Sequence, residues 1–211
     1  MNLAELIQRA WRRWDLLPGP GQILRKGLLC LRGAQIGTGT WLPKVHLPWP
    51  HQLSLGKKCI VEPDVFFKYD GFWKPGPSIK IGDRVFIGRN TEFNICCGIT
   101  IADDCLIASG CTFVDSDHGT DPDRPMNEQP MKGTQIVLEE NVWIGAQCMV
   151  LKGVRLGRGV VIGAGSVVTK SVPAGEVWAG VPARRLKQQP IKNAASEPCT
   201  RTAEILPAVV L

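Results

Sequence analysis

The stretch that decides the fold is Leu138–Val172, which reads LEENVWIGAQCMVLKGVRLGRGVVIGAGSVVTKSV. Steps of six from its first residue meet only branched aliphatics: Leu138, Ile144, Val150, Leu156, Ile162 and Val168. The residues four places beyond these leading aliphatics are all small or β-branched: Val142, Cys148, Val154, Val160, Ser166 and Val172. A period of six fits neither an α-helix nor an alternating strand. It is typical of a solenoid of very short strands joined by tight turns.

The same frame recurs upstream of Leu138, with these leading residues: Ile36, Leu55, Val61, Ile81, Ile87, Phe93, Ile101, Ile107 and Phe113. We therefore expect an all-β fold, a parallel β-helix in which three hexapeptides make one triangular coil. The leading residue and the residue four beyond it should point inward, so that Leu138 stacks on Leu156 in the next coil, about 4.8 Å away. Glycine often follows the leading residue, as at Gly145 and Gly157, and we assign it to the turning of the corner.

The frame divides the chain into three parts. Residues 1–33 form an N-terminal helical or cap segment, residues 34–187 the β-helix, and residues 188–211 a tail without the period. Within the first part, Leu3–Leu17 could form a short helix that caps the core. Its arginines Arg12 and Arg13 keep a second interpretation open, which is peripheral contact with a membrane surface.

Composition narrows the classes of partner. The formal net charge of +6 is compatible with nucleic acid, a membrane surface or a phosphate-bearing ligand. No basic run interleaved with aromatics and no nucleic-acid motif is present, so we expect no nucleic-acid partner. No apolar run has the length of a membrane span, and the N-terminus lacks the order of a signal peptide. The sequence therefore predicts a cytoplasmic protein.

The cysteines fit the frame. Cys59, Cys105, Cys111 and Cys148 all occupy the inward position four beyond a leading residue, where a free cysteine acts as a small buried hydrophobe. No CxxC pair is present, and a zinc site in a β-helix would need about three converging histidines. We therefore expect no metal.

The longest break in the frame begins in Asp115–Pro125, DSDHGTDPDRP, and we place the excursion at residues 119–135. Shorter breaks lie within residues 42–55, 67–81 and 93–101. Long excursions from a rigid scaffold often carry function. His118 stands at the root of the longest one, where an imidazole could take a proton from a hydroxyl near neutral pH. Asp115 or Asp117 could hold one ring nitrogen, although a surface histidine in a polar turn is the plain alternative.

Two segments carry a family resemblance. The run NVWIGAQCMVLKGVRLGRGVVIGAGSVVTKSVPAGEVWAGVPARRLK, together with DSDHGTDPDRP, resembles the hexapeptide-repeat O-acetyltransferases that act on sugars and surface polysaccharides. The resemblance covers residues 79–187 well and residues 36–67 loosely. It implies a left-handed coil, a homotrimer with active sites between subunits, acetyl-CoA as donor and a saccharide as acceptor.

The resemblance also implies roles for single residues. His118 matches the general base of the family, and Asn94 in FNICCGIT resembles the asparagine near the acceptor sugar. The positions that match the acetyl-CoA site are Trp143, Gly145, Ala146, Ala164, Thr169, Lys170 and Arg184. Lys170 and Arg184 belong to a basic cluster suited to phosphates. The chain departs from the family at GVPARRL, where Val181 replaces the usual asparagine.

These observations predict an O-acetyltransferase that transfers the acetyl group directly, without an acyl-enzyme. Two alternatives remain open. The acceptor could be the amine of an amino sugar or xenobiotic, or the chain could be a non-catalytic hexapeptide-repeat scaffold. The sequence leaves undetermined the acceptor, the hydroxyl acetylated and the length of the acyl group.

Overall fold

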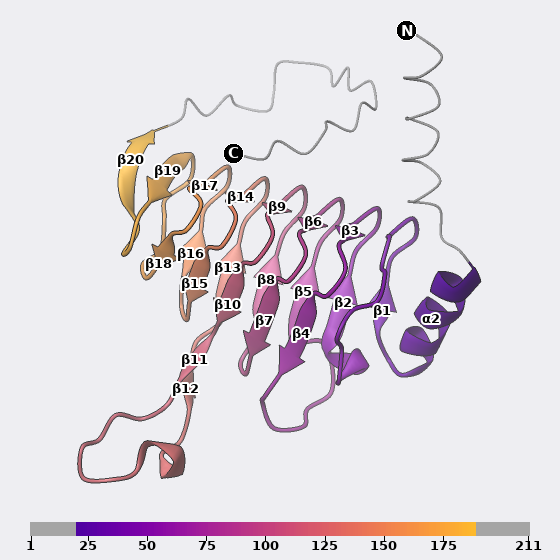
Figure 1. The fold of residues 1–211 in the computed structure, drawn as a ribbon, viewed down its shortest axis with the longest axis horizontal. Helices are drawn as coiled ribbons and strands as arrows, with labels where there is room; N and C mark the ends of the chain where they lie inside the picture. Colours follow the sequence, from indigo (N-terminus) through magenta and orange to yellow (C-terminus); the bar gives the residue numbers. More distant parts are fainter. Residues whose placement is uncertain (1–19, 189–211) are drawn as a thin grey trace, which may run out of the picture.

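The computed structural model describes residues 20–188, and these form a three-sided parallel β-helix with an α-helix at its N-terminal end (Figure 1). The walls are three parallel sheets, which we call sheets A, B and C in the order that the chain visits them. Sheet A contains β1 (Gln35–Ile36), β2 (Leu53–Leu55), β5 (Ile79–Ile81), β8 (Ile99–Ile101), β13 (Ile136–Leu138) and β16 (Arg155–Leu156). Sheet C contains β4 (Phe66–Tyr69), β7 (Glu92–Ile95), β10 (Thr112–Val114), β15 (Met149–Leu151) and β18 (Val167–Val168).

Sheet B ends differently from the other two. It contains β3 (Ile60–Val61), β6 (Phe86–Ile87), β9 (Leu106–Ile107), β14 (Trp143–Ile144), β17 (Val161–Ile162), β19 (Glu176–Ala179) and β20 (Arg184–Gln188). The last strand, β20, runs antiparallel to β19 and ends the described part of the β-helix. At the opposite end lies α2 (Pro20–Leu31), whose Leu29 packs against the core.

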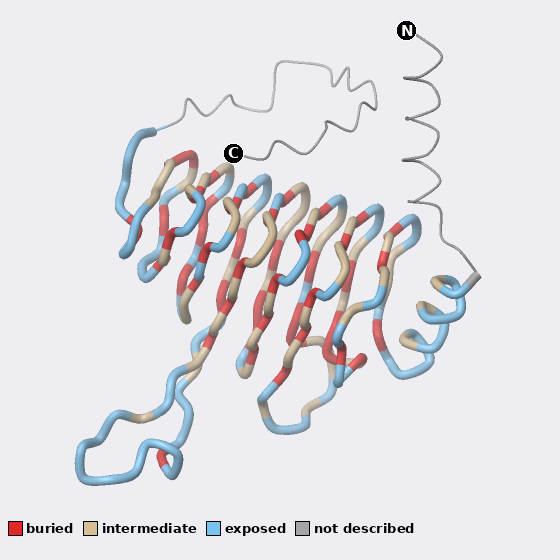
Figure 2. The backbone as a smooth tube through the Cα atoms, viewed as in Figure 1, coloured by how far each residue is buried: buried red, intermediate tan, exposed pale blue. Residues whose placement is uncertain are grey.

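The predicted inward frame is confirmed. All the leading residues from Leu55 to Val168 are at most 4% exposed, and Figure 2 shows the buried positions recurring along each wall. The register pairs Leu138 with Leu156, Ile144 with Ile162 and Val150 with Val168, as the period of six requires. In sheet C the rings of Phe67, Phe93 and Phe113 stack with centroids 5.1 and 5.0 Å apart.

The fourth position is buried, as expected, and it also donates hydrogen bonds. Cys111 Sγ donates to the carbonyl of Gly145 in the next coil at 3.2 Å, and Thr40 Oγ1 does the same to Gly56 at 2.6 Å. Cys, Ser and Thr therefore serve one purpose there, since each supplies a small donor to a buried corner carbonyl. Burial also raises the pKa of the Cys105 thiol to about 11, which keeps this thiol protonated at neutral pH.

The glycine that follows a leading residue is required by close packing and not, as expected, by the backbone angles of the corner. A Cβ added at Gly145 would lie 2.6 Å from the amide nitrogen of Ala164 in the next coil, so the coils can stack only if this position lacks a side chain. The left-handed backbone angle falls two residues later, at Gln147 with φ 56° and at Gly165 with φ 68°. Close approach of neighbouring coils, rather than a special φ, selects the first glycine.

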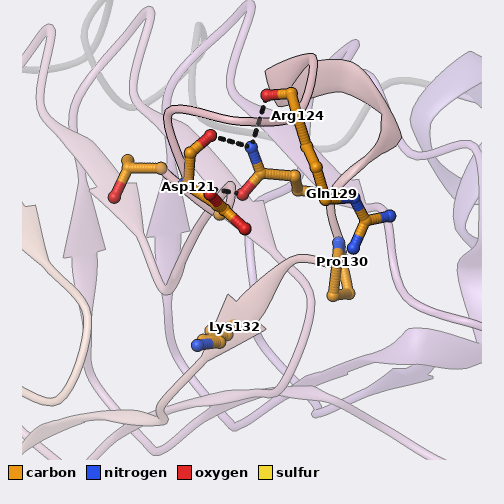
Figure 3. A pocket seen from close by; sticks show the side chains of 7 residues that line it. Asp121, Arg124, Gln129, Pro130 and Lys132 are labelled. Carbon is orange, nitrogen blue, oxygen red and sulfur yellow. Dashed lines mark hydrogen bonds between the residues drawn. The ribbon is translucent and has the colours of Figure 1, made fainter.

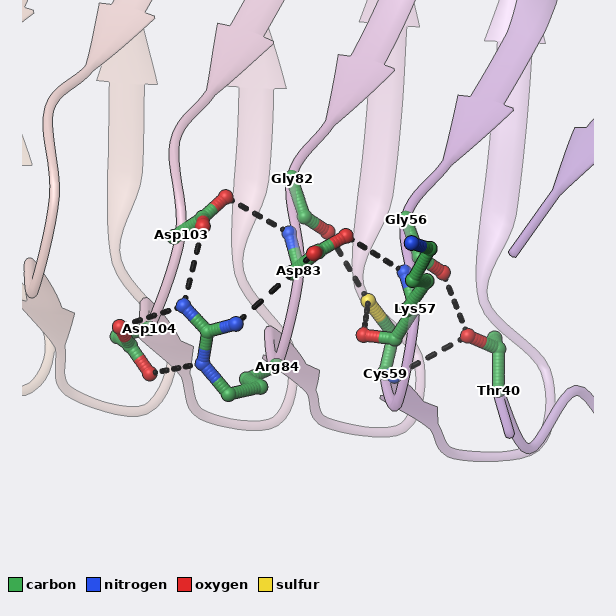
Figure 4. Close-up of polar contacts among 9 residues, drawn as sticks. All are labelled: Thr40, Gly56, Lys57, Cys59, Gly82, Asp83, Arg84, Asp103 and Asp104. Atoms are coloured by element: carbon green, nitrogen blue, oxygen red, sulfur yellow. Dashed lines mark hydrogen bonds and ion pairs between the residues drawn. The ribbon is translucent and has the colours of Figure 1, made fainter. Parts of the chain in front are cut away.

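Carboxylates fix the register where sheet A turns into sheet B (Figure 4). Asp83 accepts the amide of Lys57 from the preceding coil at 2.7 Å, and Asp103 accepts the amide of Asp83 at 2.9 Å. The guanidinium of Arg84 bridges Asp103 and Asp104 at 3.0 and 2.8 Å. These exposed contacts tie successive coils together by charge-assisted hydrogen bonds.

All the long excursions within residues 20–188 leave the helix where sheet C turns into sheet A, at what we call the C-to-A corner. They are residues 48–52, which include the 3-10 helix η1 (Pro50–Gln52), and residues 70–78, 96–98 and 116–135. The fourth is an arm that projects far from the helix in Figure 1. It starts as an antiparallel pair, β11 (Ser116–Asp117) with β12 (Lys132–Gly133), and carries the 3-10 helix η2 (Met126–Glu128).

The arm therefore begins three residues earlier than the predicted boundary at Gly119. The reason is that Ser116 and Asp117 pair with the returning strand instead of with a neighbouring coil. The predicted helix at Leu3–Leu17 and the tail after Gln188 lie outside the described residues. Between residues 20 and 188, no helix combines the length and apolar character that a membrane span needs.

Candidate active site

His118 lies on the arm and not in a coil. It directly follows β11, and its side chain is exposed. The chain has already left the coil before His118, because Ser116 and Asp117 form the antiparallel pair with the returning strand. The imidazole is thus held at the base of a projecting hairpin, where a substrate could reach it from solvent.

Asp115 holds the turn at residues 96–98 in place. Its side chain is fully buried, and its two carboxylate oxygens accept hydrogen bonds from three consecutive amides, Cys96 at 2.8 Å and Cys97 and Gly98 at 2.7 Å. The prediction that it might orient His118 is therefore wrong. Both oxygens are used by the turn at residues 96–98, which the carboxylate holds against the root of the arm.

The other candidate aspartate has a partner as well. Asp117 is exposed and forms an ion pair with Lys152, which comes from the coil that follows the arm. The structure records Lys152, in place of His118, as its partner. This contact joins the base of the arm to the wall of the helix and so contributes to the placement of the adjacent imidazole.

Asn94 lies at the same corner as His118. It is half-buried on the outer face of β7, and the register places it between Lys68 of β4 and Val114 of β10. Its carbonyl accepts the amide of Asp115 at 3.4 Å. The structure therefore brings the two predicted acceptor-side residues, Asn94 and His118, to one end of sheet C.

The predicted donor-side residues occupy other faces. Trp143 points outward from sheet B with 52% of its surface exposed. Ala146 and Ala164 follow on adjacent coils where sheet B turns into sheet C, and Gly145 contacts Ala164 there. The amide of Gly145 donates to the carbonyl of Ile162 at 2.8 Å, so this amide takes part in the pairing of neighbouring coils.

The cationic candidates are at the C-terminal end of the helix. Thr169 and Lys170 are exposed directly after β18, at the C-to-A corner. Arg184 is exposed on β20. Its neighbour Arg185 pairs with the buried Glu176 at 3.1 Å, so Arg185 is the structural cation of the two. Among residues 20–188, the guanidinium of Arg184 makes one hydrogen bond, to the carbonyl of Ala183 at 2.9 Å.

The arm borders an open hollow of about 440 Å³, lined by residues of its outward and returning segments (Figure 3). Gln129 organises it, because its amide group exchanges hydrogen bonds with the backbone of Asp121 and donates to the carbonyl of Arg124, all at 2.9 Å. His118 does not line this hollow. Within residues 20–188, no group of three or more His, Cys, Asp or Glu side chains is placed to hold a metal ion.

Two family models match the repeats. The model of the bacterial transferase hexapeptide (six repeats) matches residues 135–170, and the model of the hexapeptide repeat of succinyl-transferase matches residues 78–113. These segments contain the coils on either side of the arm. The match confirms that the period of six belongs to a known class of repeat.

Curated relatives include the galactoside O-acetyltransferase of Escherichia coli K12, which is 35% identical over 64% of this chain and 63% of that protein. A "Probable acetyltransferase" of Mycobacterium tuberculosis is 32% identical over 90% of this chain and 60% of its own length. The chain thus spans about 60% of the length of these two relatives.

Solved structures share the architecture. A hexapeptide-repeat-containing acetyltransferase from Vibrio cholerae superposes with a TM-score of 0.60 and 26% identity, over 86% of this chain and 88% of that one. An N-acyltransferase from Bacillus cereus, in complex with dTDP and 3-hydroxybutyryl-CoA, matches with a TM-score of 0.67 and 23% identity, over 78% and 88%. The predicted fold class, a left-handed parallel β-helix, is thereby confirmed. The chain therefore carries hexapeptide repeats like those of bacterial transferases at residues 78–113 and 135–170, and its curated relatives include a galactoside O-acetyltransferase.

Proposed function

We propose that the chain is an acetyl-CoA-dependent O-acetyltransferase whose acceptor is a hydroxyl of a sugar or of a surface-polysaccharide precursor. The observation that carries the proposal is the exposed imidazole of His118 at the corner that also presents Asn94. The name of the galactoside O-acetyltransferase relative supports a saccharide acceptor. Because the proposed donor is a cytoplasmic metabolite, the proposal places the reaction in the cytoplasm.

His118 acts as the general base. It removes the proton of the acceptor hydroxyl as the oxygen bonds to the acyl carbon and the carbon–sulfur bond breaks, and it returns that proton to the departing thiolate. A general base of this kind contributes about 10²–10⁴-fold in rate. Asn94 holds the acceptor, and the ion pair of Asp117 with Lys152 helps to place the base.

Direct transfer agrees with the state of the core thiols. Cys105 and Cys111 are fully buried, and the pKa of each is raised, by burial for Cys105 and first by its hydrogen bond with Cys148 for Cys111. The pKa of Cys148 is lowered by its side-chain interaction with Cys111, but this thiol is only 1% exposed. A thiol that no substrate can reach is not a nucleophile, whatever its pKa.

The donor would be held by the outward residues of sheets B and C. Trp143, Ala146 and Ala164 border one corner and suit a long thin pantetheine arm, and the exposed cations Lys170 and Arg184 suit phosphates. The unpaired amide of Ala146, free of hydrogen bonds to residues 20–188, fits this assignment because a backbone donor can bind an amide carbonyl of that arm.

The proposal includes a homotrimer with active sites between subunits. Trp143 lies on sheet B while His118 leaves from the far edge of sheet C, so one chain presents the two halves of the site on different faces. Sheet B also exposes an apolar column along its outer face, in the order Ile60, Phe86, Leu106, Trp143, Val161 and Val177. The outer column of sheet A is mostly polar, with residues such as Lys80 and Arg155. A second copy on sheet B would bury that apolar column and complete the site.

The experiment is a comparison of His118→Ala with Glu128→Ala in a thiol-release assay. Glu128 is exposed on the same arm and is the matched control. We expect His118→Ala to lower turnover by at least about 10²-fold while acetyl-CoA affinity stays within about twofold, and Glu128→Ala to leave both unchanged. Near-normal turnover by His118→Ala would remove this residue from the mechanism.

The same assay separates the alternatives. Matched hydroxyl and amine acceptors, such as galactose and an aminodeoxy sugar, are compared across pH. Turnover of the amine alone would identify an N-acetyltransferase, which requires an acceptor that has lost its proton. Absence of acetyl-CoA binding in calorimetry would instead indicate a scaffold protein.

A further inference from the structure

We propose that residues 70–77, together with Trp49 and His51, form a second saccharide-binding site that receives the part of the acceptor beyond the acetylated unit. The proposal rests on the proposed function, which it deepens by making the acceptor a chain of several sugars. We call Trp49, His51, Phe72 and Trp73 the aromatic edge. It lies at the C-to-A corner, like the arm that carries His118.

The backbone that presents these rings is fixed. Tyr69 Oη donates to the carbonyl of Phe72 at 2.7 Å, and Gln52 Nε2 donates to the carbonyl of Lys74 at 2.7 Å. Gln52 is 1% exposed, and its Oε1 accepts the hydroxyl of Ser78 at 2.6 Å. The loop is therefore held at its start, its middle and its end by buried or half-buried side chains.

The rings nevertheless face solvent. Phe72 is 97% exposed, Trp73 71% and Trp49 45%. The ring of His51 lies between the two tryptophans, with centroids 5.8 Å from Trp49 and 6.3 Å from Trp73. Exposed apolar surface costs about 25 cal/mol per Å², and the hydrogen bonds of the loop prevent it from folding back to relieve that cost. Rigid, clustered and exposed aromatics indicate a surface that binds something.

The aromatic edge is continuous with the acceptor side of the active site. The loop at 70–77 begins two residues after Lys68, whose register partner is Asn94. Lys74 Nζ donates to the carbonyl of Cys97 at 3.0 Å, and the thiol of Cys97 lies against Gly133 in the strand that returns from the arm. The loop at residues 70–77 follows β4 and the arm follows β10, and these two strands are two strand spacings apart, a distance of about 10 Å. A single sugar ring does not span this distance, so an acceptor that reaches both sites must contain more than one sugar.

A saccharide is the occupant that this chemistry favours. A pyranose has an apolar face of C–H groups, which packs on an indole or phenyl ring, and a rim of hydroxyls. Lys68, Asp70 and Lys74 supply donors and acceptors beside the rings for such a rim. Within residues 20–188, the aromatic neighbour of Trp73 is His51, whose ring is tilted by 36° and does not stack on the indole. A second copy of the chain instead fits the apolar column of sheet B.

The experiment compares Trp73→Ala with Trp73→Phe, and uses Leu28→Ala on α2 as the control. Leu28 is 53% exposed at the same end of the molecule and touches neither site. Two series of acceptors are used, maltooligosaccharides and cello-oligosaccharides from the monosaccharide to the hexasaccharide. We expect wild-type KM to fall as the acceptor lengthens in at least one series. Trp73→Ala should raise KM for the long acceptors by about 3- to 10-fold, with kcat and the monosaccharide KM unchanged. Trp73→Phe should restore most of the affinity.

A second readout needs no catalysis. Binding of the same oligosaccharides is followed by calorimetry without acetyl-CoA, and His118→Ala should bind as the wild type does. If no acceptor is acetylated but Trp73→Ala abolishes oligosaccharide binding, the proposed function fails and this site stands. If acetylation proceeds with a KM independent of chain length in both series, the site is overturned and the function stands. A change in the oligomeric state of Trp73→Ala, measured by light scattering, would assign the rings to a subunit interface and also overturn the proposal.

Discussion

Replacing Asp115 with asparagine tests how the acceptor side of the site is built. The carboxylate accepts three amides, with Oδ1 on Cys96 and Oδ2 on Cys97 and Gly98. An asparagine keeps one oxygen, so at least one amide loses its acceptor and faces an NH₂ group instead. Hydrogen bonds to a charged group are worth about 1.5–3 kcal/mol each, and a buried donor left unpaired costs about 1–3 kcal/mol.

The two terms together predict that Asp115→Asn lowers the free energy of unfolding by about 2.5–6 kcal/mol. For a protein of this size, that corresponds to a fall in Tm of roughly 5–24 °C. The matched control is Asp83→Asn, because Asp83 lies at an exposed corner, where it accepts the amide of Lys57 at 2.7 Å and forms a long ion pair with Arg84 at 3.9 Å. We expect the control to lose no more than about 1 kcal/mol.

Two assays locate the damage. Thermal melting gives the loss of stability, and hydrogen exchange gives its place. The amides of residues 96–98 should exchange much faster in Asp115→Asn than in the wild type, while those of the β13 and β16 strands stay protected. Because Asn94 and the root of the arm flank this turn, kcat should fall as well. Unchanged exchange at residues 96–98, or a melting temperature equal to that of Asp83→Asn, would refute the role assigned to the carboxylate.

The remaining predictions concern the core, the corners and the thiols. Val160→Asp should fail to give a soluble folded protein in circular dichroism, because it buries an unpaired charge at a fully buried position; a soluble and active variant would contradict the inward frame. Gly157→Ala should lower the melting temperature by several degrees, since its Cβ would lie 2.6 Å from the amide nitrogen of Ala174, whereas Gly76→Ala, with open space around it, tests only the cost of a positive φ. Cys105, whose pKa burial raises to about 11, should resist alkylation at pH 8 until the chain unfolds, while the exposed Cys97 reacts in the native state; mass spectrometry of labelled peptides checks both.

The walls of the helix could be predicted from sequence because one rule repeats in every coil. Each leading aliphatic from Leu55 to Val168 is buried, and each predicted stack is a register pair. The rule is local, since six residues decide which side chain points inward. It does not extend to the segments between coils, where no repeat constrains the chain.

The corner of the candidate site was only partly predictable, because no repeat constrains the chain there. The family resemblance led to the proposal of His118 and Asn94, but the pairing of Ser116 with Gly133 depends on the return of a strand from far along the chain. Asp115 carried a usable signal, because alternation from Phe113 places its side chain inward and a buried aspartate needs donors. The donors are the amides of Cys96, Cys97 and Gly98, in a segment that is two residues longer than the six-residue frame allows. The insertion in one coil therefore supplies the hydrogen bonds that the buried aspartate of the next coil needs.

Within residues 20–188, all the long excursions leave from one corner, and this has a consequence for how a protein of this fold could change what it binds. The other two corners must repeat in step with their neighbours, as the 2.6 Å approach at Gly145 shows, so they tolerate little variation. The C-to-A corner lets each coil carry its own insertion without disturbing the stacking of the coils. Loops at this corner could be lengthened, shortened or exchanged one at a time, which makes the corner the natural place to introduce a new binding specificity.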